Sequence, residues 1–220
     1  MPKEEYILRK EIIEVGRRLH QKNFVAANDG NISARIDSHR ILITPTTVSK
    51  GFMNPAELVI VDLSGRVIDG RKKPSSEMGM HLRIYRERND VMSVCHAHPP
   101  TATGFAVAGI PLDENVLPEV VVALGNVPLL EYKTQGTGEL TNIVGNAFKK
   151  YDAVLMSNHG VVTSGEDVFS AYYKMETVEH YAKIILTARN LGNINRLPDE
   201  EIIKLREQRA KFGIRKDLSE

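Results

Sequence analysis

Two histidines separated by one residue, His96 and His98, are the strongest chemical signal in the sequence. They close an apolar run that begins at Val91 and predicts a strand, in which residues i and i+2 project from the same face. We therefore expect the two imidazoles to lie side by side, on the face that also carries Val94. The opposite face of this strand would carry small residues, namely Ser93, Cys95 and Ala97. Paired imidazoles suit the chelation of a metal ion, although two histidines also meet at a strand end by chance.

A third candidate ligand, His159, lies between Asn158 and Gly160, where a second apolar run ends. Three imidazoles at the carboxyl ends of neighbouring strands would leave a fourth metal position open, as catalytic zinc sites require. The remaining histidines occur in charged or helical settings and are interpreted as surface or supporting residues: His20, His39, His81 and His180. His81 is a partial exception, because it follows Glu77 by four residues and would share its helix face.

Three loops rich in small hydrogen-bond donors suggest a site for an anion. Pro74-Ser75-Ser76-Glu77 places two hydroxyls and the first amides of a helix at a positive dipole end, which suits phosphate but also fits an ordinary helix cap. Asp29-Gly30-Asn31-Ile32-Ser33 and Thr44-Pro45-Thr46-Thr47 are simple turns or parts of the same anion cradle. None of the three matches a Walker or Rossmann glycine motif, so a nucleotide is not indicated.

Helices and strands that would position these residues interleave along the whole chain. Hydrophobic spacing and capping residues predict helices over residues 4–21, 74–88, 101–108, 138–151 and 166–190. Short runs rich in Ile, Val and Leu predict strands over residues 31–36, 40–44, 58–62, 91–98, 127–132 and 153–157, and another around 67–68. Because no repeat or linker divides the pattern, we predict a single α/β domain over residues 1–220, whose charged tail (196–220) is partly helical or mobile.

Composition excludes several classes of protein. The 220 residues are 42% hydrophobic and carry 29 basic and 28 acidic groups, so a net charge of +1 favours neither nucleic acid nor an anionic membrane as partner. No apolar run approaches the roughly 20 residues that span a bilayer, and the start of the chain is charged. The single cysteine, Cys95, forms no internal disulfide and is expected in the core. These features predict a cytoplasmic protein.

Five motifs together resemble the class II aldolase/adducin-head family over roughly residues 7–191. In order they are Gly30-Asn31-Ile32-Ser33, Thr44-Pro45-Thr46-Thr47, Pro74-Ser75-Ser76-Glu77, His96-Ala97-His98 and Asn158-His159-Gly160. The resemblance implies a three-layer α/β/α sandwich around a mixed, mostly antiparallel sheet, assembled as a homotetramer with sites between subunits.

The resemblance also implies roles for the motif residues. His96, His98 and His159 would bind Zn²⁺ or another divalent transition-metal ion, and Glu77 would be both a ligand of the metal before substrate binds and the proton-transfer group. Substrate phosphate would contact residues of the three loops: Gly30, Asn31, Thr46, Thr47, Ser75 and Ser76. The family pattern usually has glycine where this chain has Thr47.

The activity implied is the reversible cleavage of a ketose 1-phosphate, similar to L-fuculose 1-phosphate, to dihydroxyacetone phosphate and a short aldehyde. A metal ion that chelates two adjacent oxygens can stabilise an enediolate, so no Schiff-base lysine is required. A carboxylate beside the metal, here Glu77, can take up and return the proton. Specificity for the aldehyde would depend on loops such as residues 115–120, from a neighbouring subunit.

Several alternatives share these residues. A sugar-phosphate decarboxylase or dehydratase would keep the three histidines and Glu77, and a zinc hydrolase is less consistent with the hydroxyl-rich loops. A 4-epimerase is disfavoured, because those relatives have aspartate at the position of Glu77 and use a tyrosine or histidine near the C-terminus. The last such residues here are His180 and Tyr181, which also leaves the aldolase's proton donor to the aldehyde unassigned. An adducin-head-like binding module would lack the metal site.

Overall fold

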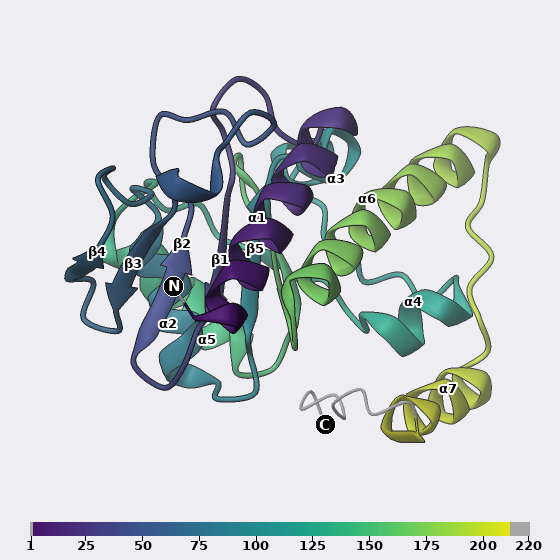
Figure 1. Cartoon of the computed structure of the whole chain (residues 1–220). Helices are drawn as coiled ribbons and strands as arrows, with labels where there is room; N and C mark the ends of the chain where they lie inside the picture. Colours follow the sequence, from purple (N-terminus) through teal and green to yellow (C-terminus); the bar gives the residue numbers. More distant parts are fainter. Residues whose placement is uncertain (1, 212–220) are drawn as a thin grey trace.

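One mostly antiparallel sheet runs through the molecule (Figure 1). The structure is a computed structural model that describes residues 2–211, and within them eight strands lie in the order β4-β3-β2-β1-β5-β8-β7-β6. Only β6 and β7 pair in parallel among them. The strands are β1 (Asn31–Arg35), β2 (Arg40–Ile43), β3 (Val59–Asp62), β4 (Val67–Asp69), β5 (Ser93–Ala97), β6 (Leu129–Leu130), β7 (Ala153–Met156) and β8 (Gly160–Gly165).

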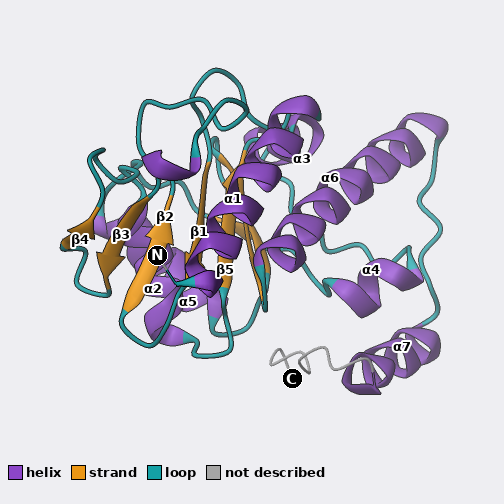
Figure 2. Cartoon of the chain, in the orientation of Figure 1, coloured by secondary structure: helices purple, strands orange, loops and turns teal. Residues whose placement is uncertain are grey.

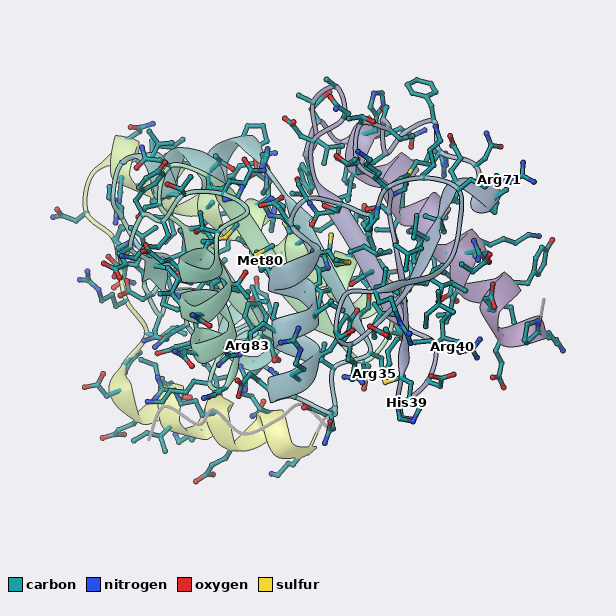
Figure 3. The ribbon with its side chains drawn as sticks, turned by 90° about the vertical axis from the view of Figure 1, so that its left-hand side faces the viewer. Arg35, His39, Arg40, Arg71, Met80 and Arg83 are labelled. Carbon is teal, nitrogen blue, oxygen red and sulfur yellow. The ribbon has the colours of Figure 1, made fainter. Side chains whose placement is uncertain are left out.

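Helices cover both faces of this sheet, which makes the predicted three-layer α/β/α sandwich (Figure 2). One face packs against α1 (Lys3–Gln21), α3 (Pro100–Val107) and α6 (Val168–Leu191). The other face packs against α2 (Met78–Glu87) and α5 (Gly138–Phe148). In the view of Figure 3, α1 lies on the right, whereas Met80 and Arg83 mark α2 near the centre.

The two cores follow from the alternation of side chains along each strand. In β2, Leu42 belongs to the core beneath α1 and α6, whereas Ile41 and Ile43 belong to the core beneath α2. In β5, Cys95 faces the first core and Val94 the second, as predicted from the strand register. The side chains that share a face with Val94, including that of His96, therefore point toward the layer that contains α2.

The main error of the prediction is β8, which was not expected. It pairs with both β5 and β7, so β5, which carries His96, and β7, which precedes His159, are not neighbours but are separated by β8. Because each pairing is antiparallel, β5 and β7 still run in the same direction and end at the same edge of the sheet. The histidines therefore converge for a different reason from the one that the sequence suggested.

Smaller differences concern element boundaries and short helices. The predicted strand over 127–132 shrinks to β6, and the helix expected from residue 74 begins only at Met78. A short helix α4 (Pro118–Ala123) and a 3₁₀ turn η1 (Pro55–Glu57) were not predicted. Part of the charged tail forms α7 (Asp199–Lys211), which packs beside α4 in Figure 1; residues 212–220 of that tail lie outside the described residues. No helix within residues 2–211 is long and apolar enough to cross a membrane.

Candidate metal and anion site

Three histidine side chains meet at the edge of the sheet where β5 ends. His96 is the fourth residue of β5, His98 follows the strand directly, and His159 lies in the turn that joins β7 to β8. One ring nitrogen from each lies within 4.8 Å of the other two. No other group of His, Cys, Asp and Glu in residues 2–211 converges in this way. The structure therefore brings together the three histidines that the sequence singled out.

The residues around His159 explain why the chain can make this tight turn. Asn158 has φ of +57°, a left-handed conformation that asparagine adopts more readily than most residues. At Gly160, an added Cβ would lie 2.5 Å from Cδ2 of His98 and 2.7 Å from the carbonyl oxygen of Ala97. A side chain at this position would push the imidazoles apart, so the Asn-His-Gly motif is a steric requirement of the cluster.

Glu77 reaches the same cluster from the other side. It is the N-cap residue of α2, and its backbone N–H donates to Oγ of Ser75 at 3.2 Å. Its side chain does not cap the helix but extends to the histidines, with Oε2 3.2 Å from Nε2 of His96 and Oε1 3.3 Å from Nε2 of His159. The serine cap predicted for this helix is thus replaced by a turn that exposes the Glu77 carboxylate to the imidazoles.

The geometry of these atoms fits a metal ion. Zn²⁺ bonds of about 2.0–2.1 Å in a tetrahedron separate neighbouring ligand atoms by about 3.4 Å, and Nε2 of His96 lies 3.2 Å from Nε2 of His98. Nδ1 of His96 is 2.9 Å from the carbonyl oxygen of Val161, an acceptor that fixes the tautomer and leaves Nε2 free to bind metal. Oε1 of Glu77 and Nε2 of His159 are buried without a hydrogen-bond partner.

Charge balance in the cluster also suits cation binding. Burial raises the pKa of Glu77, but the facing His96 and His159 outweigh it, and the pKa lies well below its usual value. Burial and the positive charge of His96 lower the pKa values of His98 and His159 to about 4. Burial lowers the pKa of His96, but the Glu77 carboxylate outweighs that effect and the pKa is raised, so a bound cation would take the place of the His96 proton. The Glu77 carboxylate and the neutral imidazoles of His98 and His159 already have the protonation states in which these groups coordinate metals.

The three donor-rich loops form one pocket beside the histidines. Ser75 N–H donates to the carbonyl oxygen of Thr44 at 3.1 Å and Thr46 N–H to that of Lys73 at 3.0 Å, which ties two of the loops together. The resulting polar pocket has a volume of about 150 Å³. All six residues predicted to contact phosphate line it, together with Glu77 and His98: Gly30, Asn31, Thr46, Thr47, Ser75 and Ser76.

Backbone conformation in the loops matches the residues found there, with one exception. Gly30 has φ of +72°, and a Cβ there would lie 2.6 Å from Cγ1 of Val25 and 2.9 Å from the carbonyl oxygen of His96. Thr47 has φ of +59° although it is β-branched, a conformation that favours glycine. The chain therefore keeps the backbone shape of a glycine at the rim of the pocket while carrying an exposed threonine side chain.

Two further pocket residues were missed in the sequence. Lys50 is only 1% exposed, and its ammonium donates to the carbonyl oxygens of Asn28 at 2.8 Å and Val48 at 2.6 Å. Burial lowers the pKa of Lys50 to about 8, although Asp29 partly opposes the shift. Gln135, from the loop before α5, also lines the pocket. A single lysine in a loop gives no sequence signal of burial, because its side chain is charged and most lysines are exposed.

Of the four histidines set aside in the sequence, one belongs to the site. Nε2 of His81 lies 2.5 Å from Oδ1 of Asn31, whose amide nitrogen donates to Oε2 of Glu77 at 2.8 Å. His20 instead packs against Phe52, and His39 is exposed in the turn between β1 and β2. The expectation that His81 would lie near Glu77 is confirmed.

Known proteins share both the sequence pattern and this fold. A model of the class II aldolase and adducin N-terminal domain matches residues 10–186. An L-fuculose phosphate aldolase of Methanococcus maripaludis is 35% identical over 82% of this chain and 97% of its own length. A 3-oxo-tetronate 4-phosphate decarboxylase of Haemophilus influenzae is 29% identical over 93% and 99%, respectively. A solved L-fuculose 1-phosphate aldolase superposes with a TM-score of 0.86, at 32% identity, over 94% of this chain and 96% of that one.

Proposed function

Since the chain belongs to the class II aldolase and adducin N-terminal domain family, we propose that it is a metal-dependent aldolase. Its reaction would be the reversible cleavage of a ketose 1-phosphate to dihydroxyacetone phosphate and a short aldehyde. The observation that carries this proposal is the convergence of three imidazoles and the Glu77 carboxylate at the wall of a polar pocket that also contains a buried lysine.

The proposed metal ligands are His96, His98 and His159, with Glu77 as a fourth ligand before substrate binds. Zinc is the proposed ion, because nitrogen donors at tetrahedral spacing suit it. When bound, the ion would supply Lewis-acid polarisation of the substrate's ketone oxygen. The four side chains converge from two strand ends and a helix start, so the fold holds them without large rearrangement.

The pocket beside the ligands is proposed to hold the substrate's phosphate group. The hydroxyls of Thr46, Ser75 and Ser76 line it, and the Lys50 ammonium adds positive charge. Hydroxyls and a cation in one cavity suit a phosphate dianion better than an uncharged sugar end. Gly30 and Thr47 also line the pocket. The side chain of Asn31, another lining residue, donates a hydrogen bond to Oε2 of Glu77.

Glu77 is proposed to move the proton at C3 of the ketose. In the cleavage direction the C3–C4 bond breaks, the proton of the C4 hydroxyl passes to solvent water, and the bonding electron pair passes toward the C2 ketone. Glu77, once it has taken up a proton from solvent, delivers that proton to C3, which completes dihydroxyacetone phosphate. In the synthetic direction it removes that proton, a role that its lowered pKa supports because the resting group is a carboxylate.

A decarboxylase is the second candidate, favoured by the similarity to the H. influenzae 3-oxo-tetronate 4-phosphate decarboxylase. Loss of CO₂ beside a ketone also sends an electron pair toward the carbonyl, and the same carboxylate could protonate the carbon that remains. We propose further that the chain works in the cytoplasm as a homotetramer with its sites between subunits, the assembly that the family resemblance implies.

The deciding experiment is a substrate panel with zinc-loaded protein. L-Fuculose 1-phosphate, other ketose 1-phosphates and 3-oxo-tetronate 4-phosphate are incubated separately, and dihydroxyacetone phosphate and CO₂ are both measured. We expect dihydroxyacetone phosphate from at least one ketose 1-phosphate and far slower release with Glu77→Gln protein. CO₂ from the 3-oxo acid alone would replace the aldolase by the decarboxylase, and turnover of unphosphorylated sugars at equal rates would remove the phosphate pocket from the proposal.

A further inference from the structure

Behind Glu77 a line of buried side chains runs away from the pocket, between β1 and α2. Tyr85 OH lies 2.8 Å from Oγ of Ser33, which lies 2.7 Å from Nδ1 of His81. Nε2 of His81 lies 2.5 Å from Oδ1 of Asn31, and the Asn31 amide nitrogen lies 2.8 Å from Oε2 of Glu77. Four consecutive hydrogen bonds thus end on the carboxylate that the proposed reaction uses.

The chemistry of the groups fixes the direction of every bond in this line. The Glu77 carboxylate only accepts, so Asn31 must present its NH₂ group to it and its carbonyl oxygen to His81. That oxygen also only accepts, so His81 must carry its proton on Nε2. A neutral imidazole then has a bare Nδ1, which accepts from the Ser33 hydroxyl, and Ser33 Oγ in turn accepts from Tyr85.

Burial keeps alternative partners away from the line. His81 and Ser33 are fully buried, and Asn31 is 3% exposed. Burial, together with the positive charge of His96, lowers the pKa of His81 to about 3, although Glu77 opposes the shift, so the imidazole is neutral over the working pH range. A buried amide whose two ends have different partners has one favourable orientation, since reversing it would place oxygen against carboxylate and NH₂ against N–H.

The two carboxylate oxygens of Glu77 have different surroundings. Oε2 accepts from Asn31, whereas Oε1 is buried, has no hydrogen-bond partner and lies 3.3 Å from Nε2 of His159. We propose that His81 is a positioning residue, which through Asn31 anchors Oε2 and so assigns proton transfer to Oε1. This inference rests on the proposed role of Glu77, and neither His81 nor Ser33 would touch the substrate.

The half-reaction at C3 tests this inference without knowledge of the aldehyde. Zinc-loaded protein is incubated with dihydroxyacetone phosphate in D₂O, and the stereospecific exchange of its C3 proton is followed by NMR. His81→Leu removes both polar atoms, whereas His81→Gln keeps a side chain that can donate to Asn31 and accept from Ser33. His180→Leu, on an exposed position of α6, is the matched control.

We expect His81→Leu to slow the exchange about 10- to 100-fold, the usual effect of losing a partner that orients a reactive group. The concentration of dihydroxyacetone phosphate at half-maximal rate should change less than the rate itself, because the other residues of the phosphate pocket and Lys50 are not altered. His81→Gln should recover most of the rate, and His180→Leu should match wild type.

A second readout does not depend on activity. A crystal structure of zinc-free His81→Leu protein should show the Asn31 amide withdrawn from Oε2 of Glu77, while the His81→Gln structure keeps that contact. If His81→Leu fails to fold, Ser33→Ala removes the hydroxyl that donates to Nδ1 of His81, and it should slow exchange a few-fold to about tenfold.

The outcomes separate this inference from the proposed function. Wild-type protein that exchanges no C3 proton would overturn the proposed role of Glu77, and the positioning role with it. Wild-type exchange with an equally fast His81→Leu variant would overturn the positioning role alone. A His81→Gln variant that exchanges as slowly as His81→Leu would also overturn the positioning role. The loss of rate would then come from the lost packing of the imidazole and not from its lost hydrogen bonds.

Discussion

Oε1 of Glu77 lies 3.3 Å from Nε2 of His159, and neither of these buried atoms has a hydrogen-bond partner. An unsatisfied buried polar group costs about 1–3 kcal/mol, so this pair destabilises the metal-free protein. A divalent cation between the two atoms would satisfy both and bring the two remaining imidazoles into its coordination shell. Metal binding and folding stability should therefore be coupled at this edge of the sheet.

The first prediction follows from that coupling. Removal of the metal with a chelator should lower the melting temperature, and added zinc should restore it, because a ligand at about 1,000 times its Kd stabilises by about 4 kcal/mol. His96→Ala protein should bind less than a tenth as much zinc as wild type, and its melting temperature should not rise when zinc is added. Zinc content and thermal unfolding measure both effects, with His180→Ala as control. Full metal content in His96→Ala would remove the three-histidine site.

The second prediction concerns Glu77→Gln. Glutamine has nearly the same shape but cannot take up a proton, so exchange at C3 of dihydroxyacetone phosphate should fall about 10²- to 10⁴-fold. The protein should remain folded, as checked by its far-UV circular dichroism, because three imidazoles still hold the metal. Exchange at the wild-type rate would show that another group moves the proton.

The third prediction concerns the buried lysine in the pocket. Lys50→Met keeps a long side chain but removes the charge, so KM for the phosphorylated substrate should rise roughly tenfold or more while kcat changes little. Wild-type KM should also rise above pH 8, since the pKa of Lys50 lies at about 8 and the ammonium is lost there. The Lys50→Met profile should lack that rise. If wild type and Lys50→Met have the same KM at pH 7, the substrate's phosphate does not bind beside Lys50.

The stability of the same pair of proteins should change with pH in a defined direction. In the unfolded chain Lys50 keeps its proton up to its ordinary pKa of 10.5, whereas in the folded protein it loses the proton near pH 8. Between these values the unfolded state binds more protons, so the free energy of unfolding of wild type should rise with pH relative to Lys50→Met. Urea unfolding of both proteins at pH 7 and pH 9.5 measures the difference.

The convergence of the three histidines was predictable because its sequence signals are local. The i, i+2 spacing of His96 and His98 needs only the period of a strand, and Asn158-Gly160 marks a turn around His159. β8 was missed because Gly160–Gly165 begins inside that turn motif and contains few large apolar residues. For this reason the prediction that β5 and β7 are neighbours was wrong. The histidines still converge, because β5 and β7 run in the same direction and end at the same edge of the sheet.

The contacts around Glu77 and the pocket could not be predicted in the same way. Asn31 and His81 are 50 residues apart in the chain, and they meet only because β1 and α2 lie in adjacent layers. Lys50 is buried where two loops meet, and each loop presents one carbonyl oxygen to its ammonium, that of Asn28 before β1 and that of Val48 after β2. Such long-range pairings depend on tertiary packing, for which a single sequence carries no periodic signal.

The last prediction concerns the strained residue at the pocket rim. Thr47 has φ of +59°, which costs a residue with a Cβ roughly 1–2 kcal/mol, and its exposed side chain offers little packing in return. Glycine adopts this conformation freely but loses about 0.5–1 kcal/mol through the greater freedom of the unfolded chain. Thr47→Gly should therefore raise the free energy of unfolding by up to about 1 kcal/mol.

Thr47→Ala is the matched control, because it removes the hydroxyl and the methyl group but keeps a Cβ at the same positive φ. Urea unfolding should rank Thr47→Gly above Thr47→Ala, and a rise in both variants alike would mean that the side chain and not the backbone is responsible. Gly30→Ala provides the opposite case, since its Cβ would meet Val25 and the His96 carbonyl oxygen at 2.6 and 2.9 Å. That substitution should destabilise the protein and weaken zinc binding, because the obstructed backbone belongs to the strand that carries His96.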